Sequence, residues 1–235
     1  MSELISQHSM IVEMQKVVKA YNTGNVEFQA LRGIDFNLKR GEFVAVVGPS
    51  GSGKSTLMNI VGCLDVATSG QYFLEGQAVN KLSHNELADI RNKKIGFVFQ
   101  AFNLLPYATA FENVEVPLLF AGAKGRTRRE RVTELLNRVG LGDKLNNKPT
   151  EMSGGEMQRT AIARALANDP DIILADEPTG NLDSKSGGEI VKIFQELWES
   201  GKTIVIITHD MNMAKKTERI IKLKDGLVDT NGNML

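Results

Sequence analysis

The stretch Gly48-Pro49-Ser50-Gly51-Ser52-Gly53-Lys54-Ser55-Thr56 decides the fold of this chain. Its spacing matches the phosphate-binding P-loop, G-x-x-x-x-G-K-[ST]. The glycines let the backbone curl so that successive N–H groups face phosphate oxygens, which larger side chains would block. Lys54 adds a positive charge near the β- and γ-phosphates, and the Ser55 hydroxyl can bind Mg²⁺. The stretch therefore predicts a site for a nucleoside triphosphate.

The residues on either side place this loop between a strand and a helix. Glu42–Val47 is an apolar run with β-branched residues, typical of a buried strand. Thr56–Val61 has the pattern of a helix, whose N-terminal dipole favours the same phosphates. The local context therefore agrees with the motif.

Composition indicates an ordinary globular protein of 235 residues, enough for one core or a core with a subdomain. Lys+Arg and Asp+Glu are both 28, so no net charge favours nucleic acid as a partner. Cys63 is the only cysteine, so an intrachain disulfide is excluded. No apolar run approaches the ~20 residues that span a bilayer, and Met1–Ser9 lacks the apolar core of a signal peptide. We therefore expect a cytoplasmic protein whose membrane role comes through a partner.

Further apolar runs predict the rest of the fold. Near-continuous apolar strands separated by helices are typical of a parallel sheet covered on both faces. Alternating runs near the P-loop predict a small antiparallel sheet. The expected strands are 10–21, 30–38, 42–47, 70–76, 94–99, 171–176, 202–208, 219–223 and 226–228, and expected helices include 56–61, 83–91 and 184–200. The fold class is therefore α/β, a P-loop NTPase (RecA-like) core with a mostly parallel sheet and an N-terminal antiparallel β-subdomain.

Residues from about 101 to 167 carry no strand pattern and predict a helical subdomain inserted in this core. Apolar residues recur at helical spacing over 127–139, and 157–168 is a second, alanine-rich helix. The segment Phe102–Phe120 is unusually apolar for a connection. Two interpretations of it stay open, a surface for a membrane partner and the core of the helical subdomain itself.

A pair of carboxylates narrows the chemistry. Asp176 ends an apolar run and Glu177 follows it. Ligands of parallel sheets bind beyond the carboxyl ends of the strands, so both side chains should arrive beside the P-loop. Asp176 can then hold Mg²⁺, and Glu177 can orient and polarise an attacking water. The pair favours hydrolysis, in which water accepts the phosphoryl group, over phosphoryl transfer to another acceptor as in a kinase.

A second anion site is predicted at Met152-Ser153-Gly154-Gly155-Glu156, where a helix begins. Free N–H groups, a positive dipole end and the absence of Cβ atoms suit an anion there. One triphosphate has one γ-phosphate, which the P-loop already surrounds. The second site therefore needs either another ligand or another copy of the protein.

In combination these motifs resemble those of ABC transporter ATP-binding subunits, over essentially the whole chain. The resemblance implies a single ABC ATPase domain, residues 1–235, that uses ATP and Mg²⁺. It implies an adenine-stacking aromatic, a Walker A loop, a signature sequence and a D-loop. The implied nucleotide contacts are Tyr21, Gly48, Ser50, Gly51, Ser52, Gly53, Lys54, Ser55, Thr56, Ser153, Gly154, Gly155, Glu156 and Asp183.

The resemblance also assigns the chemistry. It implies that Glu177, His209 and Gln100 are catalytic, and that Mg²⁺ is bound by Ser55, Gln100 and Asp176. The signature departs from the usual Leu-Ser-Gly-Gly-Gln, because it ends in a glutamate. The Glu156 carboxylate would approach a γ-phosphate, so it either contacts the nucleotide, points away or caps its own helix.

Within the family several stretches resemble the MacB/LolD group, namely 62–65, 96–100, 112–118 and 174–183. This implies a subunit that dimerises head to tail with a second copy on ATP and drives a membrane permease, in export, lipoprotein release or mechanotransmission. It would lie at the inner face of the cell membrane, with no nucleic acid partner. Two alternatives are a soluble ABC ATPase acting on DNA or ribosomes, which normally has coiled-coil insertions or tandem units, and a P-loop kinase. A kinase leaves the signature and His209 unexplained.

Overall fold

The computed structural model describes residues 10–24 and 26–229, so the expectation about Met1–Ser9 lies outside the described residues. An antiparallel sheet of four strands has the order β2-β1-β4-β5. Its strands are β1 (Met10–Thr23), β2 (Val26–Lys39), β4 (Ser69–Leu74) and β5 (Gln77–Ala78). The antiparallel β-subdomain expected from the alternating runs is therefore present.

A second sheet of six strands carries the P-loop and has the order β10-β9-β3-β8-β7-β6. Five of these strands run parallel, and β10 pairs antiparallel with β9. Their bounds are β3 (Phe43–Val47), β6 (Ile95–Phe99), β7 (Ile172–Asp176), β8 (Thr203–Ile207), β9 (Arg219–Lys224) and β10 (Leu227–Val228). β3 and β8 are buried along their whole length, which explains their uninterrupted apolar sequences.

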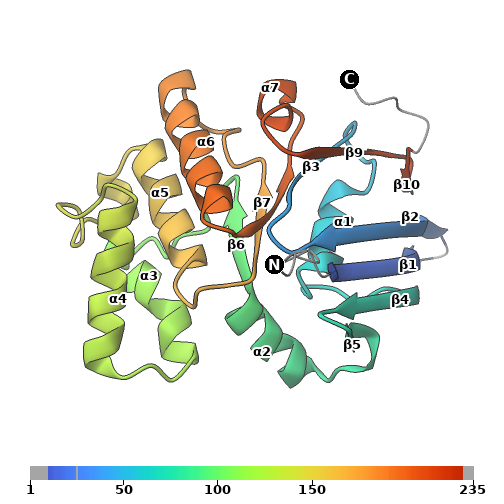
Figure 1. The fold of residues 1–235 in the computed structure, drawn as a ribbon, viewed down its shortest axis with the longest axis horizontal. Coiled ribbons are helices and arrows are strands. Elements are labelled where there is room, and N and C mark those ends of the chain that lie inside the picture. The colour runs from blue at the N-terminus through green and yellow to red at the C-terminus, as the bar shows by residue number, and fades with distance from the viewer. Residues whose placement is uncertain (1–9, 25, 230–235) are drawn as a thin grey trace, which may run out of the picture.

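Helices cover both faces of this sheet (Figure 1). On one face, Ile172 and Leu174 pack with α1 and the antiparallel sheet. On the other face, Ile173 and Ala175 pack with α3, α4, α5 and α6. The helices are α1 (Lys54–Val61), α2 (His84–Lys94), α3 (Ala110–Phe120), α4 (Gly125–Arg138), α5 (Gly154–Ala165), α6 (Ser184–Glu199) and α7 (Met211–Ala214), with 3₁₀ turns η1 (Val79–Lys81) and η2 (Pro149–Glu151).

The segment between β6 and β7, all of it described, contains helices and no strand. Figure 1 shows α3, α4 and α5 grouped on one side of the molecule, away from the antiparallel sheet. The expected helix at 157–168 begins earlier, at Gly154, because the Ser153 side chain caps it. The short helix α7 was not predicted from the sequence. Within the described ranges, no helix is both long and apolar enough to cross a bilayer.

The register of the parallel strands brings their carboxyl ends to one edge. Phe99 pairs with Asp176, and Asp176 pairs with Ile207. Val46 pairs with Ile207 in turn, so β3, β8, β7 and β6 end in line. The P-loop, His209, Glu177 and Gln100 follow these ends and therefore lie along the same edge.

Candidate nucleotide site

The P-loop connects β3 to α1 and depends on its glycines. Gly51 has φ 77° and Gly53 has φ 102°, a left-handed conformation that favours glycine. A Cβ atom at Gly48 would collide with the main-chain oxygen of Leu223. A Cβ at Gly53 would lie only 2.5 Å from the main-chain oxygen of Ala30. The loop can therefore hold its curled shape only with glycine at these positions.

The start of α1 is arranged to accept an anion. No side chain caps α1 and its first turn contains no acidic residue, whereas side chains cap α2, α3, α5 and α6. The first N–H groups of α1 are thus available to a ligand at the positive end of the helix dipole. The Ser52 hydroxyl is buried and has no hydrogen-bond partner among the described residues. The loop therefore fits a triphosphate, which would supply the missing acceptors.

Lys54 is already held over this loop. Its Nζ donates to the main-chain oxygens of Gly48 and Pro49, at 2.8 Å each. Ser55 is exposed and Thr56 is half-buried, and both lie in the first turn of α1. The cation and the hydroxyl that the sequence predicts for phosphate and Mg²⁺ are therefore both at the entrance to the helix.

Asp176 ends β7 as a half-buried carboxylate. Burial raises the pKa of Asp176, the neighbouring Glu177 charge raises it further, and Lys54 opposes both effects. A divalent cation would favour the charged carboxylate again. The described part of the chain has no group of three or more His, Cys, Asp or Glu side chains that could hold a metal alone. Asp176 with the Ser55 hydroxyl therefore fits Mg²⁺, which usually takes one or two carboxylates together with substrate phosphates.

Glu177 and His209, the two expected catalytic residues, contact each other. Glu177 is left-handed, with φ 42°, and its N–H donates to the Ile207 oxygen at 2.8 Å. One carboxylate oxygen accepts from the His209 N–H at 3.0 Å and lies 2.7 Å from its Nδ1. The other accepts from the Thr208 hydroxyl at 3.2 Å. The Glu177 side chain is 16% exposed and that of His209 75%, so the carboxylate is largely covered while the imidazole is open to solvent.

Gln100 follows β6 and forms a reciprocal pair with Asn181. The Gln100 amide donates to the Asn181 side-chain oxygen at 3.2 Å, and the Asn181 amide donates to the Gln100 main-chain oxygen at 2.9 Å. Gly180 leaves room for this pair, since a Cβ there would lie 2.7 Å from the Gln100 amide nitrogen. The sequence motifs include Asn181 but do not predict this contact. Gln100 is therefore directed at Asn181 here, and its role as a metal ligand stays a prediction.

The signature segment begins α5 with a capping box. The Glu156 N–H donates to the Ser153 hydroxyl at 3.3 Å, and the Glu156 carboxylate accepts from the Ser153 N–H at 2.8 Å. This backbone hydrogen bond, against the effect of partial burial, holds the pKa of Glu156 below its usual value. Of the three positions open to Glu156, the structure shows the cap. Asp183 likewise caps α6, accepting from the N–H groups of Lys185 and Ser186 at 3.0 Å each.

The signature and the P-loop are separate sites within one chain. A Cβ at Gly154 would lie 3.2 Å from the side chain of Leu182, so the signature packs against the turn before α6. Figure 1 shows α5 on the helical side of the molecule and α1 on the side of the antiparallel sheet. In the described ranges, no hydrogen bond joins Ser153–Glu156 to Gly48–Thr56. The sequence-predicted nucleotide residues therefore form two groups.

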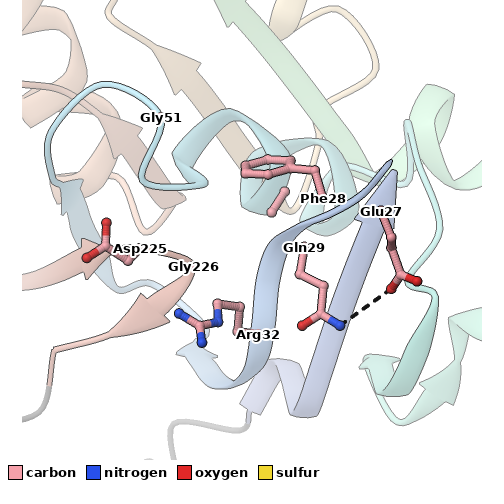
Figure 2. Close-up of a pocket in the computed structure, with 8 residues that line it drawn as sticks. Glu27, Phe28, Gln29, Arg32, Gly51, Asp225 and Gly226 are labelled. Atoms are coloured by element: carbon pink, nitrogen blue, oxygen red, sulfur yellow. Dashed lines mark hydrogen bonds between the residues drawn. The ribbon is translucent and has the colours of Figure 1, made fainter. Parts of the chain in front are cut away.

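Two aromatic side chains lie beside the P-loop. Tyr21 is 37% exposed, and its hydroxyl donates to Asp65 at 3.0 Å. Phe28 is the cross-strand partner of Tyr21 and is 57% exposed. Phe28 and Gly51 line an open pocket of about 480 Å³. Figure 2 shows Phe28 and Gly51 among the residues around it. Phe28 precedes the strand expected at 30–38, so its place opposite Tyr21 was not predicted from the sequence.

Comparisons with known proteins agree with this geometry. The family model described as ABC transporter matches residues 31–180. An ABC transporter ATP-binding protein of Thermotoga maritima is 52% identical over 219 residues, which are 93% of this chain and 94% of that protein. The MacB macrolide export ATP-binding/permease protein of Hyphomonas neptunium is 47% identical over 95% of this chain, but this chain covers only 35% of its length.

A solved structure shows the same architecture. It is the ATP-binding cassette MJ0796 of Methanocaldococcus jannaschii, solved as a dimer in a post-hydrolysis state bound to ADP and Pi. It superposes with a TM-score of 0.86 at 51% identity, over 93% of this chain and 96% of that one. The chain therefore belongs to the ABC transporter family, as an ATP-hydrolysing nucleotide-binding cassette of the group that includes MacB.

Proposed function

We propose that this chain powers a MacB/LolD-type transporter, dimerising on ATP and driving a membrane permease in export, lipoprotein release or mechanotransmission. The observation that carries the proposal is the separation of the P-loop from the signature segment, the predicted second anion site, in one chain. The P-loop has uncapped helix N–H groups and Lys54, whereas Ser153–Gly155 lies elsewhere against the turn before α6. A second copy, placed head to tail, would bring its signature to the γ-phosphate held by the first.

The chemistry follows from the residues at the strand ends. The Glu177 carboxylate, fixed by Thr208 and His209, orients the attacking water and accepts its proton. Lys54 and the first N–H groups of α1 hold the phosphates in line. The His209 ring contacts Glu177 and is also exposed, so it can contact the γ-phosphate. Asp176, Ser55 and Gln100 would hold Mg²⁺, which would supply positive charge against the charge that develops on the phosphate oxygens.

A surface groove is an observation in favour of a membrane partner. It has a volume of about 580 Å³ and lies between α2 and β6 on one side and α3 and α5 on the other. Its larger apolar lining residues are Leu64, Ile95, Phe97, Phe99, Val116, Pro117 and Phe120. Phe120 is 81% exposed at its rim, and exposed apolar surface of this kind marks partner sites.

The apolar segment Phe102–Phe120 contains both buried and exposed residues. Ala110, Val114 and Leu118 are buried in the core of the helical side of the molecule. Tyr107 is 89% exposed and Leu105 50% exposed, so this part of the segment is available to a partner. We propose that the permease contacts Leu105, Tyr107 and Phe120, which places the protein at the inner face of the membrane.

Photo-cross-linking in whole cells tests this proposal. A photoreactive amino acid at Tyr107 should give an adduct with an integral membrane protein. The matched control is Lys192 on α6. Its side chain is 77% exposed, and it does not line the groove. An adduct from Tyr107 alone supports the proposal. Products confined to copies of this chain, or equal membrane adducts from both positions, contradict it.

A further inference from the structure

The chain bends sharply just after Gln100. Phe102 has φ 61° and Asn103 has φ 51°, so two successive residues other than glycine are left-handed. This conformation is unfavourable for L-residues with a Cβ, and most of all for a bulky side chain such as phenylalanine. Such a bend persists only where the surrounding structure fixes it.

Main-chain hydrogen bonds from the Phe102 N–H to the Phe99 oxygen (3.1 Å) and from the Asn103 N–H to the Ala101 oxygen (2.6 Å) close the bend. Arg164 of α5 adds the side-chain contacts that hold it. Its Nη2 donates to the main-chain oxygen of Phe102 at 2.8 Å, and its Nη1 donates to the main-chain oxygen of Asn103. Among the described residues no carboxylate forms an ion pair with Arg164. Burial lowers the pKa of the Arg164 guanidinium, although arginine keeps its proton in proteins. The cation is therefore committed to the two carbonyls of the bend, through charge-assisted hydrogen bonds.

The position of Arg164 connects three parts of the molecule. It lies on the helix that begins with the signature, it lines the apolar groove, and it contacts the segment that carries Gln100. Farther along this segment, the buried Asn113 bonds to both main-chain groups of Leu105. Arg164 is thus the side chain that holds the strained part of the connection.

We propose that Arg164 is a positioning residue for Gln100: by holding the left-handed bend at Phe102–Asn103, it fixes the direction in which Gln100 leaves β6. Gln100 stands two residues before the bend, so relaxation of Phe102 to negative φ would turn the preceding peptide units. An occupant of the groove would touch the same guanidinium and so act on Gln100. The inference rests on the proposed role of Gln100 as a Mg²⁺ ligand.

The test measures metal affinity without turnover. Mn²⁺ binding to the full chain, saturated with a non-hydrolysable ATP analogue, is followed by the EPR signal of free Mn²⁺. Arg164→Lys keeps the charge but loses the planar fork that reaches both carbonyls. Asn103→Val leaves Arg164 intact but disfavours φ 51°, since β-branched residues avoid the left-handed region. Asn103→Gly is the matched control, because Asn103 is exposed and glycine tolerates this φ.

We expect Arg164→Lys and Asn103→Val to weaken Mn²⁺ binding about tenfold, the lower end for residues that orient metal ligands. Asn103→Gly should stay within about twofold, and adding it to Arg164→Lys should restore part of the affinity, since it relieves the strain that Arg164 otherwise holds. A purely structural role for Arg164 would not be rescued in this way. If Arg164→Lys fails to fold, the comparison of Asn103→Val with Asn103→Gly tests the proposal instead.

Gln100→Ala distinguishes failure of the positioning role of Arg164 from failure of the proposed Mg²⁺ role of Gln100. Weaker Mn²⁺ binding in Gln100→Ala, with unchanged binding in Arg164→Lys and Asn103→Val, would overturn the positioning role alone. Unchanged binding in Gln100→Ala would contradict the magnesium role of Gln100, and with it this inference.

Discussion

Removing the P-loop cation should reduce nucleotide affinity by an amount that the structure allows to be worked out. Lys54→Ala deletes an ammonium group that donates to the main-chain oxygens of Gly48 and Pro49 at 2.8 Å each. On binding, these neutral acceptors are exchanged for phosphate oxygens that carry full charge. The variant therefore loses the difference between charged and neutral acceptors, together with the Coulomb attraction.

The expected magnitude follows from the strength of hydrogen bonds to charged groups, about 1.5–3 kcal/mol each. With partial compensation from the two carbonyl contacts, we expect a loss of about 2–3 kcal/mol in binding free energy, which is roughly 30- to 150-fold in Kd. The N–H groups of the loop and of α1 keep the remaining affinity.

Titration calorimetry with ATP and Mg²⁺ measures this loss. Lys81→Ala is the control, since it removes the same charge from an exposed position in η1. The control should bind within about twofold of the unchanged chain, because Lys81 is exposed and outside the loop, where solvent and salt screen its charge. A Lys54→Ala protein with the affinity of Lys81→Ala would refute the placement of the phosphates in this loop.

Three further variants test other parts of the account. Tyr21→Ala should weaken ATP binding by roughly 1 kcal/mol, the scale of one aromatic stack, and GTP should bind about as well as ATP; rejection of GTP by orders of magnitude would reveal a base-edge contact. Asp171 joins Arg40 and Lys94 at 2.8 Å each, and although burial opposes them, these cations lower its pKa. Its stabilisation is therefore present at neutral pH and lost as pH falls through the folded-state pKa, so Asp171→Asn should cost about 1 kcal/mol in urea unfolding at pH 7 and progressively less as pH falls through that pKa. Burial and Glu177 raise the pKa of Asp176, so its charged form destabilises the nucleotide-free fold as pH rises; Asp176→Asn should raise Tm by about 1–4 °C at pH 7, with no gain in acid, and abolish Mg²⁺-dependent hydrolysis.

Local rules predicted the features that depend on local chemistry. The P-loop glycines, the buried strands and the placement of Asp176 near Lys54 of the P-loop all follow from short motifs and from the geometry of parallel sheets. The cap at Ser153 follows from a serine three residues before a glutamate, which is why Glu156 could be placed as one of the alternatives. These predictions needed no knowledge of distant contacts.

The features that escaped prediction join residues far apart in the sequence. Gln100 meets Asn181 across 81 positions, and Arg164 reaches Phe102 across 62. Both contacts depend on how the helical insertion folds back on β6. No periodic pattern in the sequence indicates which of these distant residues come into contact. The left-handed bend at Phe102 is equally hidden, because phenylalanine has no preference for positive φ. The connections between motifs are therefore visible only in the folded chain.

The mass of Glu177→Gln in ATP and Mg²⁺, measured by gel filtration with light scattering, shows whether two copies share one ATP site. The amide keeps the shape of Glu177 but cannot accept a proton, so the ATP-loaded state should accumulate. We expect a particle of about twice the 25.8 kDa of one chain, while the unchanged chain stays mostly monomeric. Adding Ser153→Arg should abolish the dimer, because a bulky cation would block the second anion site. A Glu177→Gln protein that remains monomeric with saturating ATP, or a dimer that survives Ser153→Arg, would contradict the claim that two copies complete one site.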